Sequence, residues 1–412
     1  MLFQFSLYGF LKNQRYFEPF LILAFLDRGL SYTDIGFLIG FREVCINLLE
    51  VPTGAIADVV GRRKSMIFSF ASYIGAFALF GISVHLWFLF VAMFFFSMGE
   101  AFRTGTHKAM IFDWLSHEGR AGEKTGVYGF TRSWSKIGSA VSVVIATAFV
   151  FVLQDYQLIF FLSIIPYVIN IVNFLYYPAY LDGPMQSDHS VKQIMIHLFD
   201  GLKSAFRNRL VRRLCVESMG FEGTYKVTED YLQPVIKSFA LAVPLFLGMA
   251  SVQRTALLVG LVYFVLYLLS SVASRHASWF EMHAGSEKNA AKRLWLLYLV
   301  VFLGMTVGFF FGNGIVSVAV TGFVILALLQ NFWRPMLISR FATAAPADQM
   351  ATMLSVESQG KSLFAALLAP IMGMAVDSMS ASLQFLPVGV LGVLVSAGLL
   401  LVCYRGEMCK SE

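Results

Sequence analysis

The chain contains a run of 40 residues without a charge, from Leu294 to Trp333, interrupted only by the turn residues Gly312-Asn313-Gly314. A helix needs about 20 mainly apolar residues to cross a bilayer, so this run predicts two membrane-spanning helices joined by a tight turn. Hydrophobic residues make up 58% of the sequence and charged residues 14%, whereas soluble domains average about 45–50% and about 25%. The excess apolar surface must face lipid, which excludes a soluble globular fold.

Apolar stretches recur along the whole sequence and predict an all-α membrane protein with twelve transmembrane helices. The expected spans are 2–26, 33–55, 65–84, 86–108, 125–153, 156–180, 208–236, 253–274, 293–311, 315–337, 351–376 and 380–404. Lys12-Asn13-Gln14-Arg15 interrupts the first of these spans. The third, sixth, ninth and twelfth spans carry almost no charge, so we expect these four helices to face lipid.

Lysine and arginine residues are distributed unevenly between the loops. They are frequent after even-numbered helices, whereas the loops after odd-numbered helices contain only Arg28, Lys237 and Arg254. Because short cytoplasmic loops carry the excess of these cations, we expect every even-numbered loop and both termini to be cytoplasmic. The predicted location is the cell (inner) membrane, with multiple passes.

Short sequence matches link the two halves of the chain. The series Gly9-Phe10, Arg15, Glu18 is followed 211 residues later by Gly220-Phe221, Lys226, Glu229, and Arg132 to Lys136 resembles Glu357 to Lys361. Together they favour a duplicated unit of six helices. We expect an N-terminal bundle at 1–181, a cytoplasmic linker at 182–207 and a C-terminal bundle at 208–412, forming two pseudo-symmetric six-helix bundles around a central cavity.

Several function classes are disfavoured by the sequence. The net charge of +6 comes from short cationic clusters between apolar runs, so nucleic acid is not an expected partner. We find no paired metal-ligand histidines, no nucleophile with a base and no glycine-rich phosphate loop. We therefore expect no enzyme activity, no cofactor and no metal. A transporter or a non-transporting membrane receptor remains.

The end of the second helix carries the most specific motif. It reads Gly54-Ala55-Ile56-Ala57-Asp58-Val59-Val60-Gly61-Arg62-Arg63 and resembles the loop 2–3 signature of the major facilitator superfamily, G-x-x-x-D-x-x-G-R-[RK]. Gly54 would permit close helix approach, and Asp58 could accept from N–H groups at the start of another helix. The resemblance implies a cytoplasmic gating role for Gly54, Asp58, Gly61 and Arg62, completed by an acid–base pair of Asp113 with Arg120.

The fifth helix departs from one branch of that superfamily. Proton-coupled drug antiporters often carry G-x-x-x-G-P-x-x-G-G there, whereas this chain reads Ser135-Lys136-Ile137-Gly138-Ser139-Ala140 without Gly-Pro. The runs Tyr8 to Asn13 and Gly99 to Lys108 look like those of a bacterial branch whose substrate the sequence does not reveal. A multidrug or amphiphile efflux pump therefore stays an alternative to a transporter of small organic solutes.

Charged residues inside the spans mark the candidate substrate site. Each would cost about 2.5–3.5 kcal/mol if it faced lipid at the bilayer centre, so they must pair or line an aqueous cavity. On the fourth helix, Glu100, Arg103, Thr104 and His107 share a face at i, i+3, i+4, i+7 spacing. The resemblance implies that helices 1, 4, 7 and 10 line the cavity. The candidates for substrate binding or proton coupling are Lys12, Arg15, Glu18, Glu100, Arg103, Glu222, Tyr225, Lys226 and Glu229.

The expected function is secondary active transport of a small organic solute by alternating access. Cations outnumber acids within the helices of the first half, which favours an anionic or zwitterionic solute. The resemblance favours protons as the driving ion, with Glu222 as the first coupling candidate, Glu100 the second, and Glu18 with Glu229 the third. The alternative is that Glu222 and Lys226 form a static pair one turn apart. We expect a monomer in the lipid bilayer.

Overall fold

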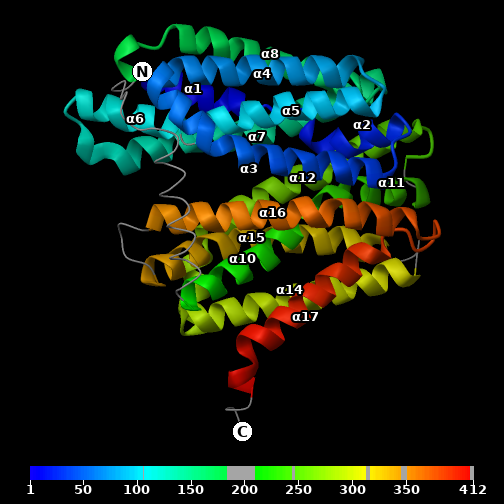
Figure 1. Cartoon of the computed structure of the whole chain (residues 1–412). Helices are drawn as coiled ribbons and strands as arrows, with labels where there is room; N and C mark the ends of the chain where they lie inside the picture. Colours follow the sequence, from blue (N-terminus) through cyan, green and yellow to red (C-terminus); the bar gives the residue numbers. More distant parts are fainter. Residues whose placement is uncertain (105, 183–208, 244–245, 312–315, 345–349, 409–412) are drawn as a thin grey trace. The chain divides into compact units, whose positions relative to one another are not determined.

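The computed structural model describes the chain except residues 105, 183–208, 244–245, 312–315, 345–349 and 409–412. The predicted linker at 182–207 therefore lies outside the described residues from position 183 onward. Every regular element in the described part is helical, as the sequence predicts (Figure 1). The helices of the first half are α1 (Leu2–Lys12), α2 (Leu21–Asp27), α3 (Tyr32–Val60), α4 (Arg62–Ile82), α5 (Leu86–Arg103), α6 (Thr106–His117), α7 (Lys124–Leu153) and α8 (Leu158–Leu175).

The second half contains a matching series of helices. They are α10 (Arg209–Thr228), α11 (Leu232–Ala242), α12 (Ser251–Arg275), α13 (Ala277–Ala284), α14 (Glu287–Phe311), α15 (Val316–Ala344), α16 (Met350–Asp377) and α17 (Leu386–Met408). Nine spans in the described residues are long and apolar enough to cross a membrane. The long helix α3 and the interrupted pairs α1–α2 and α10–α11 supply the other three expected crossings. The chain is a multi-pass membrane protein of twelve transmembrane segments.

Both halves interrupt their first helix at the same place. A 3-10 turn, Glu18–Phe20, leads into α2, and a second 3-10 turn, Glu229–Tyr231, leads into α11. These turns are 211 residues apart, the spacing of the short sequence matches. In the first half α1 ends at Lys12, which agrees with the polar interruption seen in the sequence. In the second half α10 continues to Thr228 before the turn begins.

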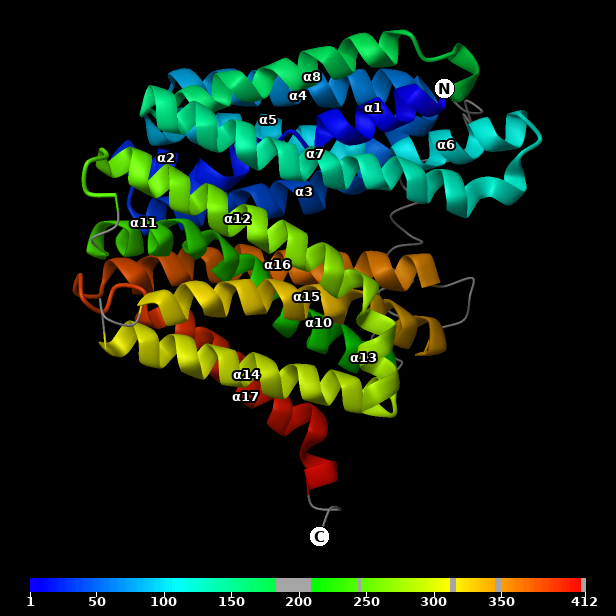
Figure 2. The same cartoon turned by 180° about the vertical axis from the view of Figure 1, so that it is seen from behind.

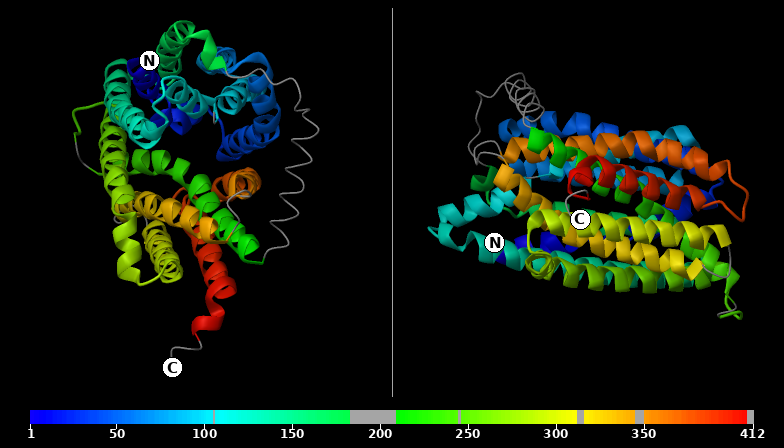
Figure 3. Two further views of the ribbon diagram at one scale, coloured as in Figure 1. Left: turned by 90° about the vertical axis from the view of Figure 1, so that its left-hand side faces the viewer. Right: turned by 90° about the horizontal axis from the view of Figure 1, so that it is seen from below.

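The internal packing of the two halves corresponds as well. In the first half α1 packs against α7, and α4 packs against both α5 and α8. In the second half α10 packs against α16, and α14 packs against both α15 and α17. The reverse view and the end-on view show these neighbours side by side within each half (Figures 2 and 3). The duplication that the short matches predict is therefore reflected in the packing.

The chain divides into two compact units. One unit comprises Met1–Arg28 and Phe41–Ile196, and the other comprises Gly29–Gly40 and His197–Glu412. The first turns of α3 belong to the second unit because α16 holds them closely. Asp377 accepts hydrogen bonds from the backbone N–H groups of Tyr32 at 3.1 Å and Thr33 at 2.7 Å. A carboxylate in this place satisfies two free donors at the helix N-terminus.

The expectation that the four charge-free helices face only lipid is too simple. On α4, Phe68 is 47% exposed, whereas Tyr73 is 1% exposed and lies among Phe77, Phe96 and Tyr167. On α17, Tyr404 is buried to the same degree, whereas Val402 is 79% exposed. Each helix has one outer and one inner face, and its tyrosine hydroxyl reaches the polar interior. Charge counting misses this because tyrosine carries no charge at neutral pH.

Candidate functional site

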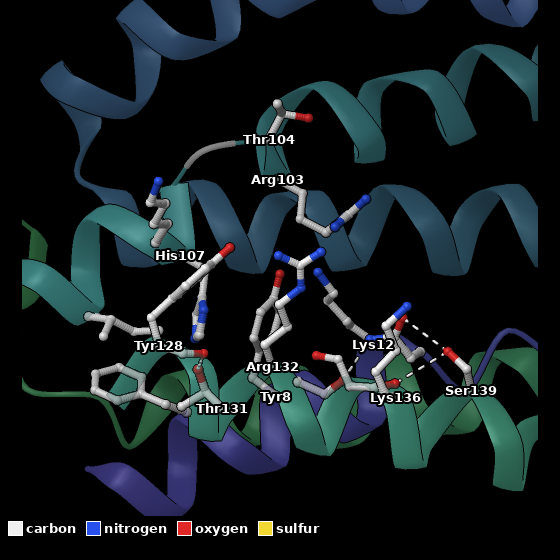
Figure 4. A pocket seen from close by; sticks show the side chains of 16 residues that line it. Tyr8, Lys12, Arg103, Thr104, His107, Tyr128, Thr131, Arg132, Lys136 and Ser139 are labelled. Atoms are coloured by element: carbon white, nitrogen blue, oxygen red, sulfur yellow. Dashed lines mark hydrogen bonds between the residues drawn. The ribbon is translucent and has the colours of Figure 1, made fainter. Parts of the chain in front are cut away.

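The first unit contains a cavity of about 510 Å³ between α1, α5, α6 and α7 (Figure 4). Its lining is strongly basic: Lys12 comes from α1, Arg103 from the end of α5, and Arg132 and Lys136 from α7, with Lys108 on α6. None of the described residues that line it is acidic. The remaining lining residues are Phe5, Tyr8, Gly9, Asn13, Thr104, His107, Ile111, Tyr128, Thr131, Ser135 and Ser139.

The cationic ends of Lys12, Arg103 and Arg132 are directed into the same space (Figure 4). Lys12 lies near enough to Arg103 and Arg132 for their charges to repel one another, and Arg132 and Lys136 repel in the same way. In the described part of the chain Lys12, Lys108, Arg132 and Lys136 have no carboxylate partner. The cavity therefore holds positive charge that the surrounding protein leaves uncompensated.

Beside this cavity, Glu100 on α5 forms the centre of a partly buried ion-pair cluster. Its carboxylate accepts a hydrogen bond from Arg15 at 3.0 Å and another from Arg103, one turn along α5. Arg103 also donates to the hydroxyl of Tyr73 at 3.4 Å, while Arg15 lies 3.6 Å from Glu18. Of the predicted candidates, the structure places Arg15, Glu18, Glu100 and Arg103 close together, and only Arg103 of these four lines the cavity.

The predicted continuous face on the fourth helix is wrong at its far end. The helix α5 ends at Arg103, and Thr104 adopts an extended conformation before α6 begins at Thr106. His107 consequently lies on a separate helix, where it is 9% exposed and its ring centroid lies 3.8 Å from that of Tyr8, with the two rings tilted by 34°. It still reaches the cavity, but helical spacing does not relate it to Glu100.

In the second unit, Glu222 on α10 lies in a buried network of two acids and two cations. Its carboxylate accepts hydrogen bonds from Lys361 of α16 at 2.7 Å and from Arg334 of α15 at 3.1 Å. Glu357 accepts from the same Arg334 at 3.0 Å and lies 3.6 Å from Lys361. Ser218, one turn before Glu222, donates to Glu357. The network balances its charges within α10, α15 and α16.

Glu222 has partners that spacing along one helix does not reveal. Sequence spacing places Lys226 beside it on α10, and the structure adds Lys361 and Arg334, from two other helices, at its carboxylate oxygens. Tyr225 and Lys226 are half-buried on the following part of α10, and Glu229 begins the 3-10 turn after it. Long side chains from packed neighbours reach a buried acid as readily as a residue on the same helix does.

A third buried acid in this unit, Glu217, is absent from the predicted site, as is Glu357. Glu217 is fully buried and accepts from Arg340 at 2.7 Å, Arg213 at 2.8 Å and the hydroxyl of Tyr404 at 3.1 Å. Neighbouring residues on α10 thus serve two separate networks, one around Glu217 and one around Glu222. The signal available in the sequence is the i,i+4 spacing of Arg213 and Glu217, which predicts an ion pair.

The predicted gating motif occupies the junction of α3 and α4. The helix α3 extends to Val60, so only Gly61 separates it from α4, and its φ of +103° is one that glycine accommodates best. The side chain of Asp58 lies outside the described residues. Gly54 is exposed, and no described atom lies within 4 Å of where its Cβ would be. The close approach predicted at Gly54 is therefore not seen.

The ionic partners at this junction also differ from those predicted. Arg62 pairs with Asp113 of α6, whereas Arg120 forms its ion pair with Glu123, three residues on. Asp182 receives the backbone N–H of Arg63 at 2.9 Å and so holds the start of α4. The residue Asp182 is assigned by the sequence to a linker, because a single acid after a helix gives no sign of its partner.

A profile described as the Major Facilitator Superfamily matches residues 5–358. The chain belongs to this superfamily. The predicted resemblance is thereby confirmed over most of the sequence, and the chain has the fold of a membrane transporter. No curated protein sequence shows significant similarity to it.

Solved structures of other superfamily members share this fold at low sequence identity. A nucleoside transporter, NupG, is similar with a TM-score of 0.81 and 12% identity over 98% of this chain and 99% of its own. A peptide transporter, POT, in complex with sulfate gives 0.71 and 14% over 98% and 94%. A D-xylose-proton symporter gives 0.67 and 12% over 97% and 96%. At such identities the likeness to these superfamily structures establishes the fold alone.

Proposed function

We propose that the chain is a secondary active transporter that moves a small organic solute with negative charge, an anion or a zwitterion's carboxylate, by alternating access. The observation that carries the proposal is the cavity of the first unit, where Lys12, Arg103, Lys108, Arg132 and Lys136 meet no acidic lining residue among those described. Uncompensated cations in a membrane interior are costly. Binding of an anion there relieves repulsion and is correspondingly favourable.

A cationic amphiphile fits this cavity poorly. Such a solute would need acidic or purely aromatic walls, and the aromatic lining residues Tyr8 and Tyr128 are already approached by Lys12 at 5.6 Å and Lys108 at 5.5 Å. The departure from the drug-antiporter motif in the fifth helix agrees with this reading. An efflux pump for cationic drugs is therefore the weaker candidate.

Proton coupling is the second element of the proposal. The four members of the network, Glu222, Glu357, Arg334 and Lys361, come from three different helices. Relative movement of those helices would change the partners of Glu222, and a carboxylate that loses cations binds a proton more readily. The D-xylose-proton symporter among the similar structures supports protons as the driving ion.

The test uses purified protein in two assays. A thermal-shift panel of anionic, zwitterionic, neutral and cationic solutes identifies binders, since a ligand that binds only the folded state raises the unfolding temperature. Uptake of the binders into proteoliposomes is then measured with and without a pH gradient. Binding and uptake of anions support the proposal. Stabilisation by cations alone, or binding without any uptake, would overturn it in favour of a drug pump or a receptor.

A matched pair of variants links uptake to the cavity. Lys136→Gln removes a lining cation, whereas Lys64→Gln removes an exposed lysine at the start of α4 that does not line it. We expect anion uptake to fall only in the first variant. Equal uptake in both variants would place the substrate elsewhere.

A further inference from the structure

We propose that the solute bound in the basic cavity of the first unit is a multivalent oxyanion, with at least two negative charges. The chemistry is that of a phosphate monoester or of a di- or tricarboxylate. This inference rests on the proposed function and narrows the substrate class of the same site.

Most cations that line the cavity form no ion pair with an acid of the described part of the protein. Arg103 shares the single carboxylate of Glu100 with Arg15. Lys12, Lys108, Arg132 and Lys136 form no ion pair with an acid in the described part of the chain, although Glu100 lies near enough to attract Lys12. A solute with one negative charge would leave most of this positive charge unbalanced. Two or more negative charges match it better.

On α7, Arg132 and Lys136 lie one helical turn apart. Like charges at this spacing repel and weaken a helix. The corresponding turn of α16 carries Glu357 and Lys361, which lie 3.6 Å apart as an ion pair. The same structural position is thus internally neutral in the second half and doubly positive in the first. A negatively charged group of the solute can pair with Lys136 in the first half as Glu357 pairs with Lys361 in the second half.

The cavity also contains hydrogen-bond donors around these cations. A guanidinium such as that of Arg132 can bind a carboxylate or phosphate with two parallel hydrogen bonds. Ser135 and Ser139 on the same face of α7 line the cavity beside Lys136, and hydroxyl groups can donate to further oxygens. Ser139 donates to Asn13, the residue after α1, at 3.5 Å, and its hydroxyl would turn from Asn13 toward a bound oxyanion. The lining therefore offers donors to several oxygen atoms at once.

Matched pairs of small anions test the charge requirement by titration calorimetry on the purified full chain. Succinate is compared with butyrate, and methyl phosphate with dimethyl phosphate, at a pH where the first of each pair is a dianion. We expect each dianion to bind at least about tenfold more tightly than its monoanionic partner. The preference between succinate and methyl phosphate distinguishes a carboxylate from a phosphoryl substrate.

Variants on α7 connect that preference to the cations. Both side chains are exposed to the cavity, so their loss should not unfold the protein, and relief of repulsion should leave the ligand-free unfolding temperature unchanged or higher. Arg132→Gln or Lys136→Gln should weaken dianion binding about tenfold and monoanion binding much less. Arg132→Lys, which keeps the charge, should retain most of the preference, and Lys64→Gln should change nothing.

The outcomes separate this inference from the proposed function. Equal affinity for monoanions and dianions, together with anion uptake, would overturn the multivalent class while anion transport stands. A dianion preference that survives both α7 substitutions would also overturn it, because the cavity would not be its origin. Failure of every anion to bind, with binding of neutral or cationic solutes, would overturn the proposed function itself.

Discussion

Arg15 donates a hydrogen bond to Glu100 at 3.0 Å, joining the segment after α1 to α5 across 85 residues of sequence. The other oxygen of the same carboxylate accepts from Arg103. One acid therefore holds two guanidinium groups next to a cavity that is itself positive. The position of Arg103 at the cavity wall depends on Glu100, although Glu100 does not line the wall.

Removal of this acid should destabilise the first unit. In Glu100→Gln, Arg15 and Arg103 lose the charge of their common partner while they remain partly buried, and loss of such a charged hydrogen-bond partner costs about 1–3 kcal/mol. We expect a clear drop of the unfolding temperature in detergent. The control is Glu123→Gln, which breaks the exposed pair with Arg120 and should leave the unfolding temperature unchanged. An equal drop of the unfolding temperature in both variants would show that the ion pairs of Glu100 stabilise the protein no more than the exposed pair of Glu123 does.

Two glycines of α7 predict opposite effects of an added methyl group. A Cβ on Gly138 would collide with the carbonyl oxygen of Phe10 on α1, a backbone atom that cannot rotate away, whereas no described atom lies within 4 Å of one on Gly129. Gly138→Ala should therefore destabilise the protein by about 1–3 kcal/mol. Gly129→Ala should be neutral or stabilise it by up to about 1 kcal/mol. Thermal unfolding of both variants measures the difference, and tolerance of Gly138→Ala would refute the close α1–α7 packing.

The helices could be predicted from the sequence because apolar length is a direct requirement of the bilayer. The repeat could be predicted too, because Glu18 and Glu229 belong to a series of matched residues that are 211 positions apart in the sequence. In the structure each of these two residues begins a 3-10 turn at the equivalent place of its half. Local breaks were harder to locate. The end of α5 at Arg103 interrupts a pattern that continues to His107, because polar residues at helical spacing persist across the break.

Ion-pair partners were the part that the sequence could not supply. Spacing along α10 predicts which residues share a face with Glu222, but Arg334 and Lys361 come from helices more than a hundred residues away. Their approach depends on how α10 packs against α15 and α16, and spacing within one helix carries no information about that. The same holds for Arg62, whose partner is Asp113 rather than an acid nearby in sequence.

The Arg62–Asp113 pair leads to a prediction about gating. Asp113→Asn removes the partner of Arg62 at the junction of α3 and α4, and Asp58→Asn alters the acid of the same motif. We expect both to shift the protein toward inward-open states, since a differential of about 1–2 kcal/mol is enough to change such populations. Spin labels on the cytoplasmic loops report the distances. Glu123→Gln serves as control, and unchanged distances with unchanged transport would remove the motif from the gating mechanism.

The loop charges lead to a prediction about orientation. Both termini and the segment near residue 190 should be cytoplasmic, because lysine and arginine concentrate in the even-numbered loops. Reporter fusions at residue 190 and after Glu412 should be active only in the cytoplasmic form. A periplasmic signal at either site would contradict the predicted orientation.

Glu222→Gln tests the coupling proposal. The substitution removes the charge that binds Lys361 at 2.7 Å and Arg334 at 3.1 Å, and glutamine cannot take up or release a proton. If Glu222 is the coupling site, the variant should still exchange substrate across proteoliposome membranes but should no longer concentrate it under an imposed pH gradient. Glu123→Gln, which changes an acid in the exposed pair with Arg120, is the comparison and should keep the gradient response. A variant that concentrates substrate as steeply as the parent would exclude Glu222, and a parent without any gradient response would exclude proton coupling altogether.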